Sequence, residues 1–585
     1  MSRRAFGGTS RTLLAGFLMA LAAVASARDS LSADQFGKRS LRTPVPMDAF
    51  APSADAGPAR HDVSGQLRFG GPVRSRTHVA DPDFVSRPER ALARSLPDDL
   101  VLDLVHDGVH VLPAQRGPMA GKHGWWQWLF EPGQAWSEPG DGGRTRVALP
   151  FALVQRNANC THNGMLMFLV GDGGVVSPVA VQVGGETCQY LQMDLWGLLP
   201  ARFTPGRAAN HAAIADAAAA ERDRRLPTQP LQAVSQRWPA VDVAALAIGD
   251  DRARTRHGLV VDGVHFTSGC DTRLGPYPAC DRLTLPSFSV AKTAVAAVAL
   301  MRLEKRYPGL ASTPLRALSE GSGCRSDAWA GVRLVDLLDM ATGHYDDPAY
   351  MADEDAGKVA AFFGARTHAL KLAFACEAYA RREAPGRRWV YHTSDTYLLG
   401  AALDQALAKR TAGSARDVFD DVLLPDVFEP LGLSQTARYT RRTEDPAAQP
   451  FFGWGQFLRA DDVAKLARFL GQARGDAGAG PVLDARLLDE AMQRVPGAGG
   501  LQAAHLENYR YQHGVWAREL GAQLGCKEPL WVPFLSGFGG ITVALFPNGV
   551  AWYSFADDGR LASIDFAGPA REVAKIRPLC ASAAG

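Results

Sequence analysis

A serine and a lysine stand three positions apart in residues 286–292, which read P-S-F-S-V-A-K. Positions at this spacing share one face of a helix, so the hydroxyl of Ser289 and the amine of Lys292 can meet in one pocket. A serine hydroxyl is a poor nucleophile until a base removes its proton, and a desolvated lysine can be that base. The spacing therefore indicates acyl transfer, with Ser289 as nucleophile and Lys292 as proton-transfer partner.

The helix that follows the serine predicts that this lysine is buried. Residues 290–303 are apolar at nearly every position, and Y-P-G at 307–309 ends the helix. Burial of an unpaired ammonium is costly and lowers the pKa of a lysine. Arginine stays protonated and could not act as a base. By itself S-x-x-K is a weak pattern, because a lysine that snorkels from a surface helix gives the same letters.

Further motifs follow along residues 235–585. They are L-V-D-L-L-D-M-A-T-G-H at 334–344, W-V-Y-H-T-S-D-T-Y-L-L-G at 389–400, G-W-G-Q at 453–456 and G-F-G-G at 537–540. In this order and spacing the region resembles the β-lactamase-related serine hydrolases, the class C-like group that includes penicillin-binding proteins, esterases and amide hydrolases. The resemblance implies an α+β, β-lactamase/transpeptidase-like fold. An antiparallel sheet flanked by helices would adjoin an all-helical subdomain, with the active site between them.

The resemblance assigns a third catalytic group. Tyr391 matches the catalytic tyrosine of the family and would shuttle a proton with Lys292 between Ser289 and the leaving group. A phenol is neutral at pH 7, so base work requires a neighbouring ammonium to lower its pKa. We therefore expect Tyr391 beside Lys292, with a lowered pKa.

The resemblance also places the oxyanion hole, as two backbone N–H groups that belong to Ser289 and Ile541. Gly539 and Gly540 precede Ile541 and would allow substrate to approach the backbone closely, although glycines in an ordinary turn would look the same.

Two residues depart from the family pattern. Thr393 stands where the family often has asparagine, so a hydrogen-bonding group remains but the amide donors are lost. Phe538 stands where the third motif usually has lysine or histidine, which helps to hold a substrate carboxylate in true β-lactamases. Phenylalanine carries no charge, so the departure favours an esterase or neutral-amide hydrolase over a β-lactamase or D,D-peptidase.

The expected reaction is hydrolysis of an ester or amide in a small molecule or peptide, through an acyl-enzyme and without metal or organic cofactor. One alternative is a sensor that is acylated but does not turn over. A second is a carbohydrate-binding protein with a degenerate hydrolase half, but the joint presence of Ser289, Lys292 and Tyr391 argues against degeneracy. Another activates the serine through a triad of His392, His344 and Asp395. No G-x-S-x-G elbow surrounds Ser289, so the lysine mechanism is favoured.

The remaining chain divides by composition. Residues 1–27 have the charged start, apolar run and A-S-A end of a Sec or twin-arginine signal peptide, which predicts a periplasmic or secreted protein with no membrane span after cleavage. Residues 28–95 predict an irregular leader, 96–205 a smaller all-β domain of the sandwich type, 206–234 a helical linker and 235–585 the hydrolase domain. Tryptophans at 125, 126, 128 and 136 could bind cell-wall or glycan material, but aromatic clusters are more often core.

Composition narrows the partners and the compartment. The 585 residues are 46% hydrophobic and 21% charged, with a formal net charge of +2, which argues against a nucleic-acid partner. Eight cysteines without a CxxC pair favour disulfides over a zinc site in an exported chain. Proximity along the chain pairs residues 160 with 188, 270 with 280, 324 with 376 and 526 with 580.

Overall fold

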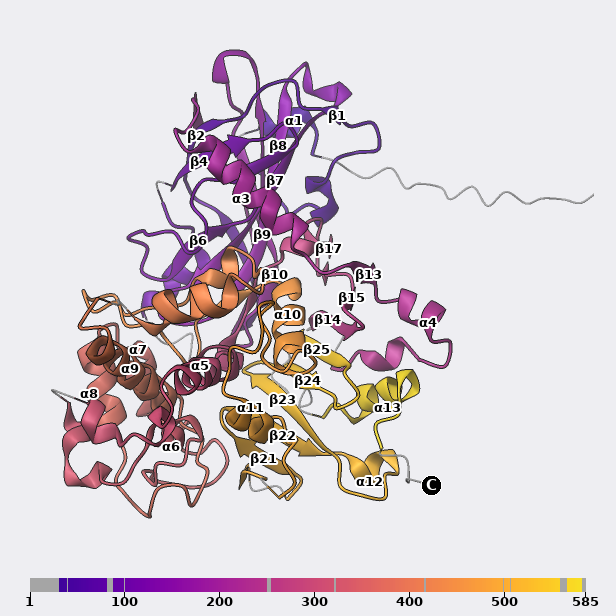
Figure 1. The fold of residues 1–585 in the computed structure, drawn as a ribbon. Coiled ribbons are helices and arrows are strands. Elements are labelled where there is room, and N and C mark those ends of the chain that lie inside the picture. The colour runs from indigo at the N-terminus through magenta and orange to yellow at the C-terminus, as the bar shows by residue number, and fades with distance from the viewer. Residues whose placement is uncertain are drawn as a thin grey trace, which may run out of the picture.

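The computed structural model describes residues 31–580 except 39, 81–87, 99, 250–253, 320–321, 415–416, 498, 505–506 and 558–564. The predicted signal peptide lies outside the described residues. An N-terminal domain of strands sits against a larger C-terminal domain of mixed helices and strands (Figure 1). Among the described residues, no helix combines the length and apolar character that crossing a bilayer requires.

One antiparallel sheet forms the N-terminal domain, in the order β12-β2-β4-β5-β7-β8-β9-β10-β11-β3. Two further strands, β1 and β6, pair with β7 and β8. The strands are β1 (Gly57–Pro58), β2 (Gly65–Phe69), β3 (Arg74–Ala80), β4 (Leu100–His106), β5 (His110–Pro113), β6 (Trp126–Phe130), β7 (Gly133–Ser137), β8 (Thr145–Gln155), β9 (Thr161–Val170), β10 (Val179–Thr187), β11 (Leu191–Leu199) and β12 (Ala201–Pro205).

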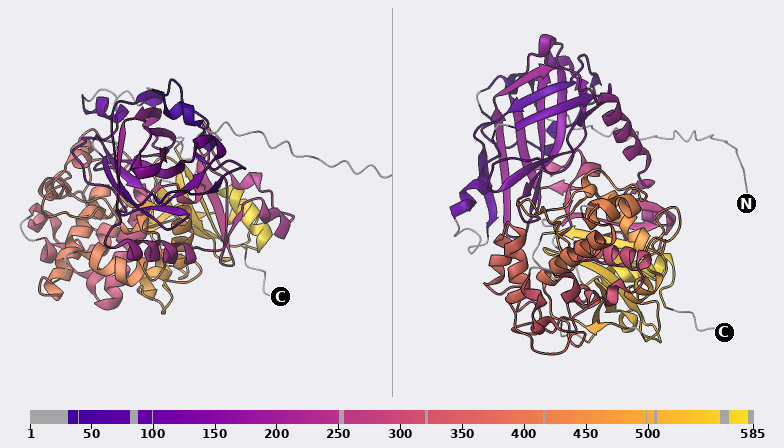
Figure 2. Two further views of the ribbon diagram at one scale, coloured as in Figure 1. Left: turned by 90° about the horizontal axis from the view of Figure 1, so that it is seen from above. Right: turned by 60° about the vertical axis from the view of Figure 1, so that its left-hand side comes forward.

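The register of these strands closes the sheet on itself. β2 and β3 follow one another along the chain, as do β11 and β12. β3 pairs antiparallel with β11, and β2 pairs antiparallel with β12, so the two ends of the strand order meet. The prediction of an all-β domain is confirmed, but the sheet is single and closed where a two-sheet sandwich was expected (Figure 2). Three of the four clustered tryptophans, Trp126, Trp128 and Trp136, are buried.

One segment before the hydrolase domain differs from its predicted character, and another is helical as expected. Residues 28–95, which were expected to be irregular, supply β2 and β3. The strand β3 was not predicted because its side chains are mostly exposed and show no apolar alternation. The leader also contains the short helix α1 (Ala33–Phe36). The expected helical linker contains α3 (His211–Asp223), which packs Ala218 against Val105 and Leu112 of the closed sheet.

A second antiparallel sheet forms the centre of the C-terminal domain, in the order β13-β15-β14-β25-β24-β23-β22-β21-β20, with a parallel pair at β13 and β15. The strands are β13 (Thr228–Pro230), β14 (Arg254–Val261), β15 (Val264–Thr267), β20 (Leu501–Gln502), β21 (Tyr509–Gln512), β22 (Val515–Glu519), β23 (Trp531–Gly537), β24 (Ile541–Leu545) and β25 (Ala551–Ala556). Short two-stranded pairs join β16 (Asp271–Thr272) to β17 (Gly275–Pro276) and β18 (Leu285–Pro286) to β19 (Phe457–Leu458).

Alternation along these strands buries both faces of the sheet. Val260 and Val543 belong to the core that contains α10, whereas Leu259 and Ala544 belong to the core that contains α13. Helices therefore cover both faces, and a helical region lies beside the sheet, as the α+β prediction requires (Figure 1). The helices are α4 (Ala233–Arg237), α5 (Val298–Arg306), α6 (Leu334–Leu338), α7 (Val359–Gly364), α8 (His368–Glu377), α9 (Thr393–Arg410), α10 (Ala460–Leu470), α11 (Ala485–Ala491), α12 (Gly521–Leu524) and α13 (Ala567–Ile576).

One predicted strand is absent from its expected place. The apolar sequence V-D-V-A-A-L-A-I at 241–248 predicts a strand, but the structure has a 3-10 turn at Ala244–Leu246. Leu246 is buried, and its carbonyl accepts a hydrogen bond from the indole of Trp552 at 2.9 Å. The apolar residues at 241–248 are therefore explained by packing against the sheet.

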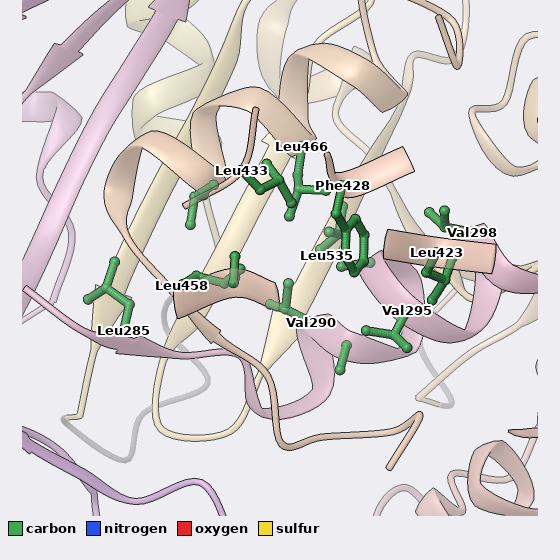
Figure 3. Packing of buried hydrophobic residues seen from close by; sticks show 14 of the residues in the cluster. Leu285, Val290, Val295, Val298, Leu423, Phe428, Leu433, Leu458, Leu466 and Leu535 are labelled. Carbon is green, nitrogen blue, oxygen red and sulfur yellow. The ribbon is translucent and has the colours of Figure 1, made fainter. Parts of the chain in front are cut away.

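The segment that carries the serine crosses the main core as three joined helical pieces. They are a 3-10 turn (Phe288–Val290), a π-helical segment (Lys292–Ala297) and α5. Figure 3 shows Val290 and Val295 of this segment among Leu535 of β23, Leu458 and Phe428. This packing confirms the predicted burial of the helix and fixes its position against the end of β23.

Four disulfides join the cysteines in the pairing expected from proximity: Cys160–Cys188, Cys270–Cys280, Cys324–Cys376 and Cys526–Cys580. Each bridge lies within one domain. Their number indicates an oxidising environment for the folded chain.

Candidate active site

Two donors converge on the hydroxyl of Ser289. The amine of Lys292 donates a hydrogen bond to Ser289 Oγ at 3.1 Å, and the phenol of Tyr391 donates to the same oxygen at 2.6 Å. Lys292 Nζ also lies 4.6 Å from the centre of the Tyr391 ring. The structure therefore brings together the three side chains that the sequence predicted to be catalytic.

Lys292 is 2% exposed, and burial lowers its pKa to about 8, against the opposing charges of Glu354 and Asp395. Its Nζ donates a second hydrogen bond to Thr393 Oγ1 at 2.8 Å. Thr393 in turn donates its hydroxyl to the carboxylate of Glu354, which also accepts the Thr393 backbone N–H at 3.0 Å. The lowered pKa lets the amine lose its proton near neutral pH.

Tyr391 differs from the sequence expectation. Burial, with the carboxylate of Glu354 as a second cause, raises the pKa of Tyr391 above its usual value, although its hydrogen bonds to Ser289 and Thr393 act in the opposite direction. The expected lowering of this pKa by the neighbouring ammonium is not found, and burial is the largest cause because Tyr391 is only 9% exposed. At neutral pH the phenol therefore stays protonated, whereas Lys292 is the member of the pair whose pKa is lowered.

The end of β23 lies against the turn that carries Ser289. A Cβ added to Gly537 would come within 3.0 Å of the Ser287 carbonyl oxygen. The predicted donor Ile541 pairs with Gly537 across β23 and β24 and is fully buried in the core. Residues 536–540 line the cavity in front of the serine. The strand-to-strand turn thus faces Ser289, whereas Ile541 belongs to the layer behind it.

Gly539 and Gly540 have φ values of 90° and 108°. Side-chain-bearing residues rarely adopt this region, so the turn itself requires these glycines. The Phe538 side chain between Gly537 and Gly539 is 45% exposed, and its ring centre lies 5.5 Å from that of Phe288.

A cavity of about 740 Å³ opens in front of Ser289. Aromatic side chains make up much of its wall, and both domains contribute: Trp125 and Tyr190 from the N-terminal domain, and Phe288, Phe363, Tyr350, Trp454, Trp516 and Phe538 from the C-terminal domain. No group of three or more histidine, cysteine, aspartate or glutamate side chains within the described residues is arranged to hold a metal ion.

The sequence profile of the family described as Beta-lactamase matches residues 240–553, which is more than half of the chain. The chain belongs to the beta-lactamase family. Members of this family are serine hydrolases, and the Ser289 cluster has the composition that such an enzyme needs. No curated protein sequence matches this chain.

Solved structures similar to this chain come from several hydrolases. A D-stereospecific amidohydrolase from Streptomyces sp. is 16% identical, covers 56% of this chain and 98% of its own, and has a TM-score of 0.39. A class C beta lactamase from Rhodobacter sphaeroides is 16% identical, covers 62% and 98%, and has a TM-score of 0.38. EstCE1, a hydrolase with promiscuous acyltransferase activity, is 17% identical, covers 62% and 99%, and has a TM-score of 0.42.

Within this beta-lactamase family member, the alternative triad is held apart from the serine. His392 Nε2 lies 2.9 Å from Asp353, and its ring stacks on Tyr379. His344 stacks on Trp329. Asp395 is buried, which raises its pKa to about 7. These partners hold both histidines in the helical subdomain, whereas Lys292 and Tyr391 contact the serine.

Sequence reasoning missed Glu354 and the N-terminal wall of the cavity. Glu354 lies in an acidic loop, D-E-D at 353–355, that carries no motif, and only the fold brings it to Thr393. Gln155, Asn159 and Tyr190 come from a domain without a catalytic pattern. The even spacing of strands gave no sign of which strand ends would face the serine.

Proposed function

We propose that this family member is an exported serine hydrolase that cleaves uncharged carboxylic esters or amides through an acyl-enzyme on Ser289. One observation carries the proposal: a single hydroxyl oxygen accepts hydrogen bonds from a buried lysine at 3.1 Å and a buried phenol at 2.6 Å. A hydroxyl between a neutral amine and a proton-donating phenol is equipped to lose one proton and to return one.

The proposed reaction has two steps. Neutral Lys292 takes the hydroxyl proton while Ser289 Oγ bonds to the carbonyl carbon. When the tetrahedral intermediate collapses, Tyr391 gives its phenolic proton to the leaving oxygen or nitrogen and regains a proton from the Lys292 ammonium. Water then attacks the acyl-enzyme with the same groups in reverse order, which releases the acid and restores Ser289.

For the oxyanion hole we propose the backbone N–H groups of Ser289 and Phe538. The contact between the Phe288 and Phe538 rings and the approach of Gly537 to Ser287 support this pair. The N–H of Phe538 takes the place of the predicted donor Ile541, which is buried behind the turn. One such donor contributes about 10²–10³ in rate, so the placement of this turn matters for catalysis.

The substrate that fits this site has an uncharged, apolar acyl group. Phe538 stands with Phe288 and Tyr190 near the serine, with ring centres 5.5 Å and 6.2 Å from its own. These rings present no cation to a carboxylate, and the two arginines of the cavity wall, Arg156 and Arg366, both pair with Glu444. The cavity of about 740 Å³ has room for a medium-sized acyl group. Esterase activity is therefore favoured over hydrolysis of carboxylate-bearing β-lactams or D,D-peptides.

Parallel assays test this proposal. We expect a p-nitrophenyl hexanoate ester to be hydrolysed with a kcat/KM at least tenfold above that of a chromogenic cephalosporin, and Ser289→Ala to abolish both activities. Faster turnover of the cephalosporin would contradict the substrate class. A stoichiometric burst of p-nitrophenol without further turnover would instead identify the acylated sensor.

Export rests on two observations. Residues 1–27 have the composition of a signal peptide, and the four disulfides require an oxidising compartment to form. We expect the protein expressed with its own N-terminus to be recovered outside the cytoplasm, with an intact mass that lacks about 27 residues. Retention of the full-length chain in the cytoplasm would contradict export.

A further inference from the structure

A side chain of the N-terminal domain holds the turn that carries the proposed nucleophile. Asn159 lies between β8 and β9, beside the Cys160–Cys188 disulfide, and is fully buried. Its Oδ1 accepts hydrogen bonds from Phe288 N at 2.9 Å and from Ser287 Oγ at 3.1 Å. These are the two residues that precede Ser289.

The same side chain also binds the glycine-rich turn at 453–456, which lies beside Ser287. Asn159 Oδ1 accepts a third hydrogen bond, from Gly455 N at 2.7 Å, and its Nδ2 donates to the Gln456 carbonyl at 3.2 Å. One amide group thus uses both of its ends, and four partners in the hydrolase domain depend on it. A buried group with this many partners fixes their relative positions, because loss of the amide would leave several donors unpaired.

The backbone at Phe288 explains why such a clamp is needed. Phe288 has a φ of 39°, in the left-handed region that a phenylalanine rarely adopts. Conformations of this kind persist only where the surroundings determine them, and they gather at functional sites. Phe288 directly precedes Ser289, so its φ sets the direction in which the Ser289 side chain and N–H point.

We propose that Asn159 is a positioning residue for the reaction: it clamps residues 287 and 288 so that Ser289 faces Lys292, Tyr391 and the proposed oxyanion hole. The inference rests on the proposed function of Ser289. It makes the N-terminal domain part of the active site, because the hydrolase domain lacks one of the groups that shape its nucleophile turn.

A second asparagine provides a matched control. Asn163 is also buried and also crosses the domain boundary, where Nδ2 donates to the Thr284 carbonyl and Oδ1 accepts the Thr284 N–H, both at 2.9 Å. Thr284 precedes the serine by five positions, so Asn163 anchors the domains without contacting the turn. Replacement of either asparagine removes a buried interdomain amide, but only Asn159 contacts residues 287 and 288.

The first experiment compares Asn159→Ala, Asn159→Asp and Asn163→Ala in the full-length protein, with p-nitrophenyl hexanoate as substrate. We expect Asn159→Ala to lower kcat about 10²-fold, as misplacement of a reacting group by about 1 Å does, and to change KM less than threefold. Asn159→Asp keeps the accepting oxygen, so it should recover at least a tenth of the wild-type kcat. Asn163→Ala should retain kcat within threefold. Circular dichroism at the assay temperature verifies that each variant is folded.

A kcat within threefold of wild type in folded Asn159→Ala would overturn the proposal. Equal losses in Asn159→Ala and Asn163→Ala would also overturn it, because the effect would then belong to the domain boundary in general.

Hydrogen exchange tests the clamp independently of turnover. Asn159→Ala should speed amide exchange at least tenfold in peptides that contain Phe288 and Gly455, whereas Asn163→Ala should leave these two peptides unchanged. Unchanged exchange in Asn159→Ala would refute the clamp, even if the wild-type protein is an active hydrolase. Faster exchange in a protein whose Ser289 is inert would uphold the clamp and refute the proposed function alone.

Discussion

Replacement of Glu354 by glutamine should move the pH dependence of the reaction to lower pH. Glu354 contacts Thr393, which accepts a hydrogen bond from Lys292, and its negative charge favours the ammonium form of that lysine. Glutamine keeps an oxygen that can accept the Thr393 N–H but has no charge. The substitution therefore removes one electrostatic effect while it preserves most of the hydrogen bonds.

The size of the change follows from the pKa of Lys292. With the ordinary pKa of 10.5, about one lysine in 3,000 is neutral at pH 7, whereas a pKa of about 8 makes about one in ten neutral. A nearby opposite charge is typically worth about 1–3 pKa units. Without the carboxylate the pKa of Lys292 should fall to about 5–7, so at least about half of the amine would be neutral at pH 7.

The assay is kcat/KM for p-nitrophenyl hexanoate between pH 5.5 and 9, which reports the base of the free enzyme. The wild-type rate should rise with pH to a midpoint near 8, and the Glu354→Gln midpoint should lie at least about one unit lower. Asp355→Asn is the matched control, because Asp355 lines the same cavity but is not among the charges that shift the pKa of Lys292. An unchanged or raised midpoint in Glu354→Gln would show that the Glu354 charge does not hold up the pKa of Lys292.

Three further substitutions test separate parts of the account. Tyr391→Phe should lower kcat about 10²–10⁴-fold while circular dichroism stays unchanged; a loss below tenfold would show that the phenol transfers no proton. Lys292→Met should be inactive yet more stable to urea, by up to about 3 kcal/mol at pH 7. The pKa of Lys292 is about 8 in the folded state and about 10.5 in the unfolded state, so the unfolded state binds more protons. The gain in the free energy of unfolding of Lys292→Met over wild type should therefore shrink as pH rises from 8 to 10.5. A gain that does not change with pH would contradict the burial of this lysine. Phe538→Ala should raise KM for a hexanoate ester about 5–30-fold, because it removes about 1–2 kcal/mol of apolar contact with the acyl chain. KM for an acetate ester is the control, and equal changes for both esters would contradict an acyl-binding role.

Local patterns could predict the catalytic centre because its chemistry lies within one helical turn. Ser289 and Lys292 are three positions apart, and the apolar residues around them already predict that the amine is buried. Tyr391 was found through the motif around it. The helices α6, α8, α9 and α10 and the strands β24 and β25 were likewise visible as apolar periodicity, whereas α7, α11, α13 and β23 were not predicted.

Long-range contacts account for what the sequence did not reveal. Glu354 and Asn159 reach the site from a motif-free loop and from another domain, and no spacing along the chain connects them to Ser289. The raised pKa of Tyr391 depends on how deeply its side chain is buried, and the sequence alone does not show this depth. Closure of the N-terminal sheet depends on register between residues 65–80 and 191–205, which strand spacing alone leaves open.

The most direct test of the account is labelling of the intact protein with a fluorophosphonate, followed by peptide mapping. We expect one added label per chain, on the peptide that contains Ser289, and labelling that falls at least about 10²-fold in Lys292→Met because its base is lost. A label on any other serine, or undiminished labelling of Lys292→Met, would contradict the claim that a buried amine activates this hydroxyl.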